Sequence, residues 1–370
     1  MSLKRLARSI LYALLLLGIV FSLLAPKFPR FIESGYSTKF YYWVIRPYSL
    51  LTGLFPFSLA ELIVVGVTVF ILFQAFRAVI FYKKYRKDFA RGFLKKSVSL
   101  ALVPVFLYLA FNLMWGLNYN RLTFAEISGL PVEAVSVNEL AELAQHLAQR
   151  ANELRDLVTE DDRQIMSLPH GIKDMFSRAH LGYERAAGIY PELGGHYGRP
   201  KGVMLSHYWS YTGISGVFFP FTAEANVNIK MPHFMLPATT AHEMAHQRGF
   251  AREDEANYLA YLTCTSHPDP DFQYSGVLFA LIFVMNTLHK YDTEMWSDIR
   301  SQYSGGVNRD LSDWREYIQR YEGSVKQVST RVNNTYLKAK RQKEGVQSYG
   351  RMVDLLLAEF RVRKTNNSSQ

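Results

Sequence analysis

Residues 242–246 combine two histidines and a glutamate in a spacing that suits metal-assisted hydrolysis. His242 and His246 stand four positions apart, so on a helix their imidazoles lie on one face and can share a cation. Zn²⁺ accepts nitrogen and oxygen ligands in such sites. Glu243 directly follows the first histidine, where its carboxylate can act as general base toward a metal-bound water. The spacing therefore predicts a zinc site of the HExxH type, with His242 and His246 as ligands and Glu243 as catalytic residue.

A third metal ligand is expected from the acidic segment that follows. Gly249 allows a sharp turn after the second histidine, and a second helix can then return toward the metal. Glu253 and Asn257 fit an E-x-x-A-[D/N] pattern, in which Glu253 binds the metal and Asn257 orients the Glu253 carboxylate. Glu255 stays open as the alternative third ligand.

Two other interpretations of these histidines agree less well with the residues around them. A metzincin would carry a histidine where Arg252 stands, and a guanidinium that stays protonated cannot bind a metal. The histidines could also be structural core residues. Several ionisable groups on apolar helices are costly to bury without a metal or a charge partner, so the combination favours a metal.

Residues 206–221 are the expected substrate-binding edge. Zincins place an edge strand beside the active-site helix, where its free backbone groups pair with an extended peptide. Short strands are predicted at residues 203–206 and 216–221, and an ordinary strand with turns is the alternative. The tetrahedral oxyanion also needs a stabilising group. The candidates, which spacing does not separate, are His207, Tyr211, His233 and Tyr258.

Three apolar runs in the first third of the chain approach the length of a membrane span. They cover residues 9–25, 54–80 and 98–118. Pro26 is a poor residue after a signal-peptidase cut, so the first run is expected to remain as an anchor. The basic residues between 82 and 96 predict that this loop and the N-terminus lie in the cytoplasm. The segment between the first two runs, residues 26–51, and everything after residue 118 are then expected to be extracytoplasmic.

The remainder of the chain has the helical pattern of a soluble domain. Residues 136–157 begin with a capping-box pattern and carry leucines near helical spacing. Residues 277–288 are apolar but too short for a fourth span, so a core helix is expected. Further helices are predicted at residues 172–187, 237–247, 253–265, 311–321 and 349–362, and a disordered tail at 364–370.

Composition narrows the class of protein. The net charge of +10 comes largely from residues beside the apolar runs and in the C-terminal region, a placement that favours membrane topology. Nucleic-acid binding is not expected, because no zinc-finger, RNP-type or helix-turn-helix signature occurs. The lone cysteine, Cys264, excludes an intrachain disulfide and is expected to be a small buried hydrophobe.

Residues 237–257 resemble the signature of uncharacterised membrane proteins of Gram-positive bacteria, a domain of unknown function with three N-terminal spans. The resemblance extends over most of the chain and includes residues 216–228 and 345–349. More distantly, the site is similar to gluzincin-type integral-membrane zinc peptidases of the CAAX-processing and heat-shock membrane protease kind. That similarity implies His242, His246 and Glu253 as ligands and Glu243 as base. Asn257 replaces their usual aspartate, and the linker between the two motifs is shorter.

Together these patterns predict a mainly α protein in three parts: a membrane region (1–118), an α+β zincin-like domain with a small sheet (119–363) and a tail (364–370). The expected function is a zinc metallopeptidase of the bacterial envelope, anchored in the cytoplasmic membrane and acting on a peptide or protein. A zinc-binding envelope sensor without catalytic activity is the alternative. A transporter component is a weaker possibility, because transport paths need polar groups at mid-membrane.

Overall fold

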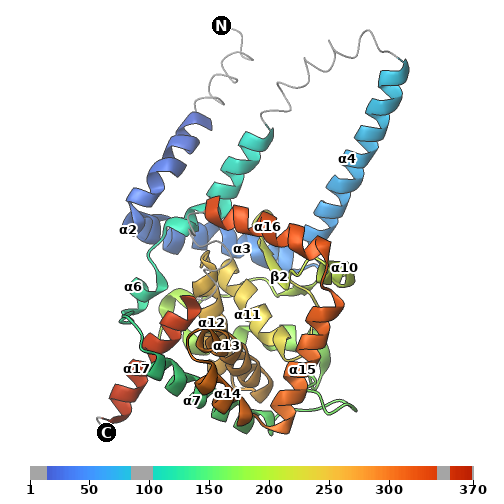
Figure 1. Cartoon of the computed structure of the whole chain (residues 1–370). Coiled ribbons are helices and arrows are strands. Elements are labelled where there is room, and N and C mark those ends of the chain that lie inside the picture. The colour runs from blue at the N-terminus through green and yellow to red at the C-terminus, as the bar shows by residue number, and fades with distance from the viewer. Residues whose placement is uncertain (1–14, 85–102, 340–350, 369–370) are drawn as a thin grey trace.

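The computed structural model describes residues 15–84, 103–339 and 351–368 (Figure 1). The chain is mainly helical with one small sheet, as the sequence predicts. Three apolar helices extend from the same side of a compact helical body, and α11, α12 and α13 lie at its centre. Most of the predicted basic loop at 82–96 and the stretch at 345–349 lie outside the described residues.

Two helices are long and apolar enough to cross a membrane, or up to three if a bent helix pair counts as one span. In α4 (Leu59–Lys84), the stretch Leu59–Ile80 has a mean hydropathy of 2.3 and none of its most apolar window is buried in the protein. The second helix, α13 (Pro270–Tyr291), has 67% of its window buried. This burial fits the core helix that the sequence predicts there.

The other two predicted spans appear in a different form. A helix over Leu15–Lys27 bends by 109° into Pro29–Gly53, so the chain turns sharply after its first apolar run. The third run is described as a shorter helix, Val103–Met114. Residues 9–14 and 98–102 of the predicted spans lie outside the described part of the chain.

The segment after the bend is helical rather than a simple connection. It consists of η1 (Ala25–Lys27), α2 (Pro29–Phe31), the π-helical η2 (Ile32–Tyr41) and α3 (Tyr42–Gly53). One side of this segment packs on the domain through buried Ile32 and Tyr41, and the other exposes large apolar side chains such as Trp43 and Leu51. Helices of this kind lie at the boundary between membrane and water.

The core of the domain forms around α7 (Val137–Arg155), α11 (Met235–Gln247), α12 (Glu253–Ser266) and α13. The predicted capping box of α7 is present, because Ser136 accepts from the Glu139 amide and Glu139 binds back to Ser136. The remaining helices are η3 (Gly116–Asn120), α6 (Phe124–Ser128), α8 (Gly171–Arg178), α9 (His180–Ala186), η4 (Pro191–Leu193), α10 (Ser206–Ser210), α14 (Thr293–Ser301), α15 (Gly305–Arg320), α16 (Ser324–Ala339) and α17 (Met352–Ser368).

Two helix predictions need correction. The single helix expected at 172–187 is two short helices, α8 and α9, which meet at Ala179. Residues 364–368, predicted as part of a disordered tail, continue α17, and Lys364 forms an ion pair with Glu142 of α7 at 2.8 Å.

The sheet has three strands in the order β1-β3-β2, formed by Lys201–Gly202, Glu224–Val227 and Gly216–Phe219 respectively. The central strand β3 is fully buried, pairs in parallel with β1 and pairs antiparallel with β2. The strand predicted at 203–206 is wrong. The amides of Met204 and Leu205 instead bind the carboxylate of Glu61 at 2.9 and 2.7 Å, which diverts this backbone from the sheet.

A buried ion pair joins the sheet to the base of α4. The carboxylate of Glu224 accepts hydrogen bonds from the amides of Leu59 and Ala60 at 3.2 and 2.8 Å, and it pairs with the ammonium of Lys201. The first-turn amides of a helix lack intrahelical acceptors. A negative charge at this end is also stabilised by the positive end of the helix dipole. Glu224 therefore fixes the start of the candidate span to β3.

We expect Glu224→Gln to destabilise the folded protein strongly. Lys201 would keep its charge in a buried position without a carboxylate partner, a loss of about 3–5 kcal/mol. Thermal unfolding in detergent measures the effect. The matched control is Glu322→Gln, because its pair with Lys326 is solvent-exposed and contributes about 0.3–0.5 kcal/mol. Equal melting temperatures for the two variants would contradict the structural role of Glu224.

Candidate metal centre

Three side chains from α11 and α12 converge on one point. His242, His246 and Glu253 each offer a ligand atom, and these atoms lie within 4.8 Å of one another. The nearest Glu253 oxygen, Oε2, is 3.3 Å from His242 Nε2 and 3.6 Å from His246 Nε2. We call this group the metal cluster. The structure thus brings together the three residues that the sequence predicts as ligands.

The spacing of these atoms fits a shared cation better than direct hydrogen bonds. Charge-assisted N–H···O bonds are about 2.7–2.9 Å long, shorter than either contact to Glu253. A tetrahedral metal with bonds of about 2.0–2.1 Å holds its ligand atoms about 3.3–3.4 Å apart. The cluster is therefore a group that could hold a metal ion.

The turn between α11 and α12 sets this geometry. Gly249 has a φ of +82°, in the left-handed region that favours glycine, and its amide binds the carbonyl of His246 at 2.9 Å. The amide of Phe250 binds Ala245 at 3.1 Å, which completes a Schellman motif. The Phe250 carbonyl then lies 2.7 Å from His246 Nδ1. Since a carbonyl only accepts, Nδ1 carries a proton, and Nε2 is the nitrogen directed at the cluster that can bind a cation once its own proton leaves.

Electrostatics couple the members of the cluster. Burial alone would raise the pKa of Glu253, but the two imidazoles outweigh burial and hold its pKa well below the usual range. Burial opposes charge on His246, yet Glu253 raises the pKa of this imidazole to about 9. The carboxylate is therefore charged and ready to bind a cation, which would replace the proton on His246.

Glu243 lies beside the cluster and has an unused oxygen. Its Oε2 is buried and has no hydrogen-bond partner among the described residues. The carboxylate packs against Gly216 of β2, where an added Cβ would come within 2.5 Å of Oε1. Burial raises the pKa of Glu243, and the imidazoles of His242 and His246 oppose that rise. An unpaired buried carboxylate next to a candidate metal site is suited to accept a proton.

The structure separates the two carboxylates that the sequence left as alternatives. Glu255 faces away from the metal cluster and accepts hydrogen bonds from the Phe124 amide at 2.9 Å and from Arg252 at 2.8 Å. Its role in this geometry is to hold the start of α6. Asn257 is buried, and its Nδ2 has no partner in the described part of the chain. The expected contact that orients Glu253 stays a prediction.

The four candidates for oxyanion stabilisation lie elsewhere. His207 and Tyr211 form an aromatic group with Tyr321, and His233 accepts from the Leu168 amide at 3.3 Å. Tyr258 is fully buried between Phe124 and Tyr261. Within the residues that the structure describes, none of the four forms a hydrogen bond or ion pair with the metal cluster.

A tyrosine that the sequence did not single out lies nearer. Tyr336 of α16 bonds the hydroxyl of Tyr119 at 3.2 Å. Burial raises the pKa of Tyr336 to about 12; the bond with Tyr119 lowers it and the charge of Glu253 raises it. Its distance in sequence from residues 242–253 leaves no local signal, so only the fold reveals this position.

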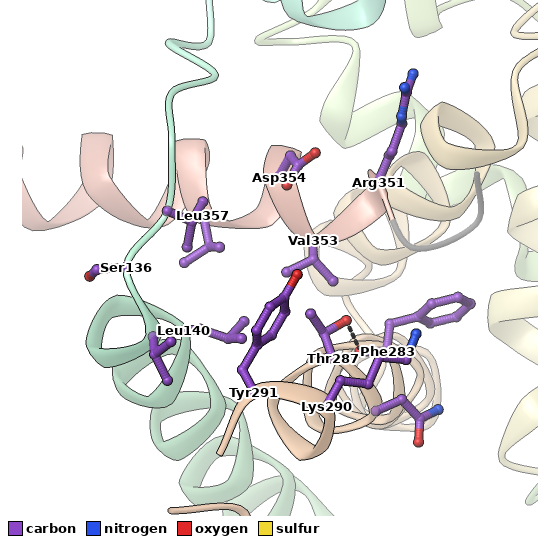
Figure 2. A pocket seen from close by; sticks show the side chains of 13 residues that line it. Ser136, Leu140, Phe283, Thr287, Lys290, Tyr291, Arg351, Val353, Asp354 and Leu357 are labelled. Atoms are coloured by element: carbon purple, nitrogen blue, oxygen red, sulfur yellow. Dashed lines mark hydrogen bonds between the residues drawn. The ribbon is translucent and has the colours of Figure 1, made fainter. Parts of the chain in front are cut away.

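A separate cavity of about 760 Å³ lies between α7, α13 and α17 (Figure 2). Its lining mixes apolar side chains such as Leu140 and Leu357 with the charged Lys290 and Asp354. No residue of the metal cluster lines it. We assign no chemistry to this cavity.

Residues 36–357 match the family described as "Protein of unknown function (DUF3810)". The chain belongs to this family. The match includes α4, the sheet and every residue of the metal cluster, and it agrees with the resemblance to an uncharacterised family. No curated protein and no solved structure shows a match to the chain. Membership in the DUF3810 family assigns no activity, and the more distant similarity to membrane zinc peptidases stays a prediction.

We expect Glu253→Gln to lower the metal content of this DUF3810 protein and Glu255→Gln to leave it unchanged. Loss of a contact that orients a ligand lowers metal affinity about 10–100-fold, and loss of the ligand itself lowers it further. The metal affinity of Glu253→Gln should therefore fall by at least that factor. Glu255→Gln should bind like wild type, because its carboxylate holds Phe124 and Arg252 instead. Elemental analysis after loading with Zn²⁺ measures this. Metal loss in Glu255→Gln alone would refute the assignment.

Proposed function

We propose that this protein is a membrane-anchored, zinc-dependent metallopeptidase that hydrolyses peptide bonds. The observation that carries the proposal is the convergence of His242, His246 and Glu253 within 4.8 Å, beside the Glu243 carboxylate, whose buried Oε2 has no hydrogen-bond partner among the described residues. A structural group of buried residues would have no need for an unsatisfied carboxylate at this position.

Zinc is the metal that suits this donor set best. Two imidazole nitrogens and one carboxylate oxygen are common zinc ligands, and three protein ligands leave the fourth position for water or substrate, as in catalytic sites. When bound, zinc would polarise the scissile carbonyl and lower the pKa of water. The three side chains hold the ion, and the fixed tautomer of His246 keeps its Nε2 directed at it.

Glu243 acts as the general base in this proposal. It takes a proton from the attacking water and later delivers that proton to the leaving amine. Burial raises the pKa of the Glu243 carboxylate, so the protonated form that the second step requires is easier to reach. Tyr336 bonds the Tyr119 hydroxyl and is close enough to Glu253 for that charge to raise its pKa, which makes it our candidate for stabilising the oxyanion.

The sheet supplies a binding edge for an extended peptide. β2 is an outer strand in the order β1-β3-β2, and its Gly216 lies against Glu243. A substrate strand added to β2 would pass next to the proposed base. This edge and the unpaired carboxylate favour a catalyst over the alternative, an envelope sensor that binds zinc without turnover.

We also propose that the protein is a multi-pass protein of the bacterial cytoplasmic membrane, with its N-terminus inside and the catalytic domain outside. The basic residues between 82 and 96 support this orientation, because basic loops remain on the cytoplasmic side. Cysteines introduced into α15 and into the basic loop, tested with a membrane-impermeant reagent on intact cells, would distinguish the two orientations.

The substitution Glu243→Gln should retain metal and lose about 10²–10⁴-fold in turnover, the usual contribution of a general base. The assay is cleavage of a broad peptide library by purified protein in detergent, read by mass spectrometry, with metal content measured on the same sample. His246→Ala should lose both metal and activity. Wild-type turnover in Glu243→Gln would exclude the role, and metal-loaded wild type without any cleavage would favour the sensor.

A second variant tests how Glu243 is positioned. Gly216→Ala would bring a Cβ within 2.5 Å of Glu243 Oε1, so the carboxylate must move. We expect turnover to fall about tenfold or more, as for small displacements of catalytic groups, with full metal content. Gly323→Ala is the matched control, because an added Cβ there meets nothing within 4 Å. Unchanged turnover in Gly216→Ala would show that the contact has no role in catalysis.

A further inference from the structure

Helix α16 has three distinct sides. One side packs on the domain and includes the fully buried Leu337. A second carries Val325, Val328 and Val332, which recur at helical spacing and are 54%, 58% and 65% exposed. Polar residues such as Gln327, Arg331 and Lys338 occupy the third side. We call the three valines the valine stripe. Its exposure leaves an apolar helix face without a protein partner among the described residues.

The position of α16 indicates what covers this stripe. In Figure 1, α16 lies at the level at which the apolar helices leave the helical body. Tyr336, one turn beyond Val332, bonds Tyr119, whose ring packs edge-on against Trp115 at 5.3 Å. Trp115 directly follows the apolar helix Val103–Met114. The stripe therefore leads to the level at which that helix joins the domain.

Other exposed apolar side chains lie at the same level. Met204 and Leu205 are exposed, and their amides bind Glu61 in the first turn of α4. Trp43 and Leu54 are exposed at the other candidate boundary helix. Because this apolar zone is continuous with helices that could span a bilayer, lipid is the occupant that fits. Arg331 and Lys338 on α16 add the positive charge that attracts anionic headgroups.

The metal cluster lies directly beneath this zone. Trp115 Nε1 donates to the carbonyl of the ligand His246 at 3.0 Å, so one side chain separates the end of an apolar helix from the cluster. At the other end of the valine stripe's helix, Tyr336 interacts with the charge of Glu253. The cluster thus lies next to the point at which one apolar helix joins the domain.

We infer that the valine stripe of α16 rests on the bilayer and that the metal cluster cleaves polypeptide close to where it leaves the membrane. The substrates are then membrane-anchored proteins, cut next to their anchors. The substrate class rests on the proposed peptidase function, whereas the contact of α16 with lipid does not.

The lipid contact is tested with single-cysteine labels, since the native Cys264 is buried. A polarity-sensitive fluorophore is attached to Val328→Cys, or to Thr330→Cys about 160° around the helix. The protein is placed in liposomes of phosphatidylcholine and phosphatidylglycerol containing brominated lipid. We expect about twofold quenching at 328 and none at 330, because an interfacial helix buries its apolar face roughly 5–10 Å. The lipid contact would be overturned if aqueous iodide quenched the label at 328 and brominated lipid did not. It would also be overturned if neither quencher reached that label.

The substrate class is tested with two anchored reporters in the same liposomes. Each carries a randomised segment between a leucine-rich span and a fluorescent tag, placed either next to the span or beyond a long flexible linker. Both reporters have the same local concentration at the membrane. A difference in their cleavage rates therefore reports the distance of the cut segment from the span. We expect the near segment to be cut about tenfold faster and Val328→Asp to remove this preference with metal content unchanged, whereas Thr330→Asp keeps it.

The outcomes separate the two proposals. Equal cleavage of both reporters would overturn the substrate class and leave the peptidase intact. Metal-loaded protein that cleaves neither reporter would overturn the peptidase and the substrate class together, and the fluorescence labels would still decide whether α16 contacts lipid.

Discussion

The charge of Glu253 in a buried position is the constraint on which the site depends. A carboxylate removed from water needs positive or polar partners, and here two imidazoles from the neighbouring helix provide them. They meet it only if α11 ends and α12 begins within a few residues and in one relative orientation. The Schellman turn at Gly249 supplies that orientation, and the same turn presents the Phe250 carbonyl to His246. One local backbone feature thus determines both where the helices point and which nitrogen is available.

The C-terminal end of α11 is held by segments from the side of the domain that carries the apolar helices. Trp115, Tyr41 and Arg121 donate to the carbonyls of three residues at and just after that end. Arg121 also pairs with Glu33 of η2 at 2.6 Å. Carbonyls at the end of a helix lack intrahelical donors. Hydrogen bonds from the segments next to the apolar helices therefore connect the metal cluster to that part of the protein in addition to chain connectivity.

Local patterns in the sequence predict much of this site. The spacing of His242 and His246 and the E-x-x-A-N pattern at Glu253 identify the converging side chains, because both depend on helix periodicity and a short turn. The core helix α13 is likewise recognisable by its length. Non-local features are not: Tyr336 reaches the cluster through tertiary packing, and Glu255 is removed from consideration only by its bonds to Phe124 and Arg252.

The errors have similar causes. Residues 203–206 have a strand-like composition, and the Val203 amide still binds the Val227 carbonyl of β3 at 3.0 Å. Glu61, more than 140 positions earlier, binds the amides of Met204 and Leu205, and the pairing ends there. The helices after the first bend are not predicted from the sequence, because their apolar side chains cover only one face and are interrupted by basic residues. Amphipathic helices at a boundary give weak signals in both span length and core periodicity.

The cap that Glu224 provides for α4 has a consequence for biosynthesis. Leu59 and its acceptor are 165 positions apart, so the ribosome completes the start of α4 long before the strand that caps it. During that interval the Leu59 and Ala60 amides have only water or headgroups as acceptors, whereas the Glu61 amide already has Ser58 Oγ. The final seating of α4 therefore follows the folding of β3. A nascent chain whose sheet fails to form would leave this helix end exposed, where cellular quality control can distinguish it from the finished protein.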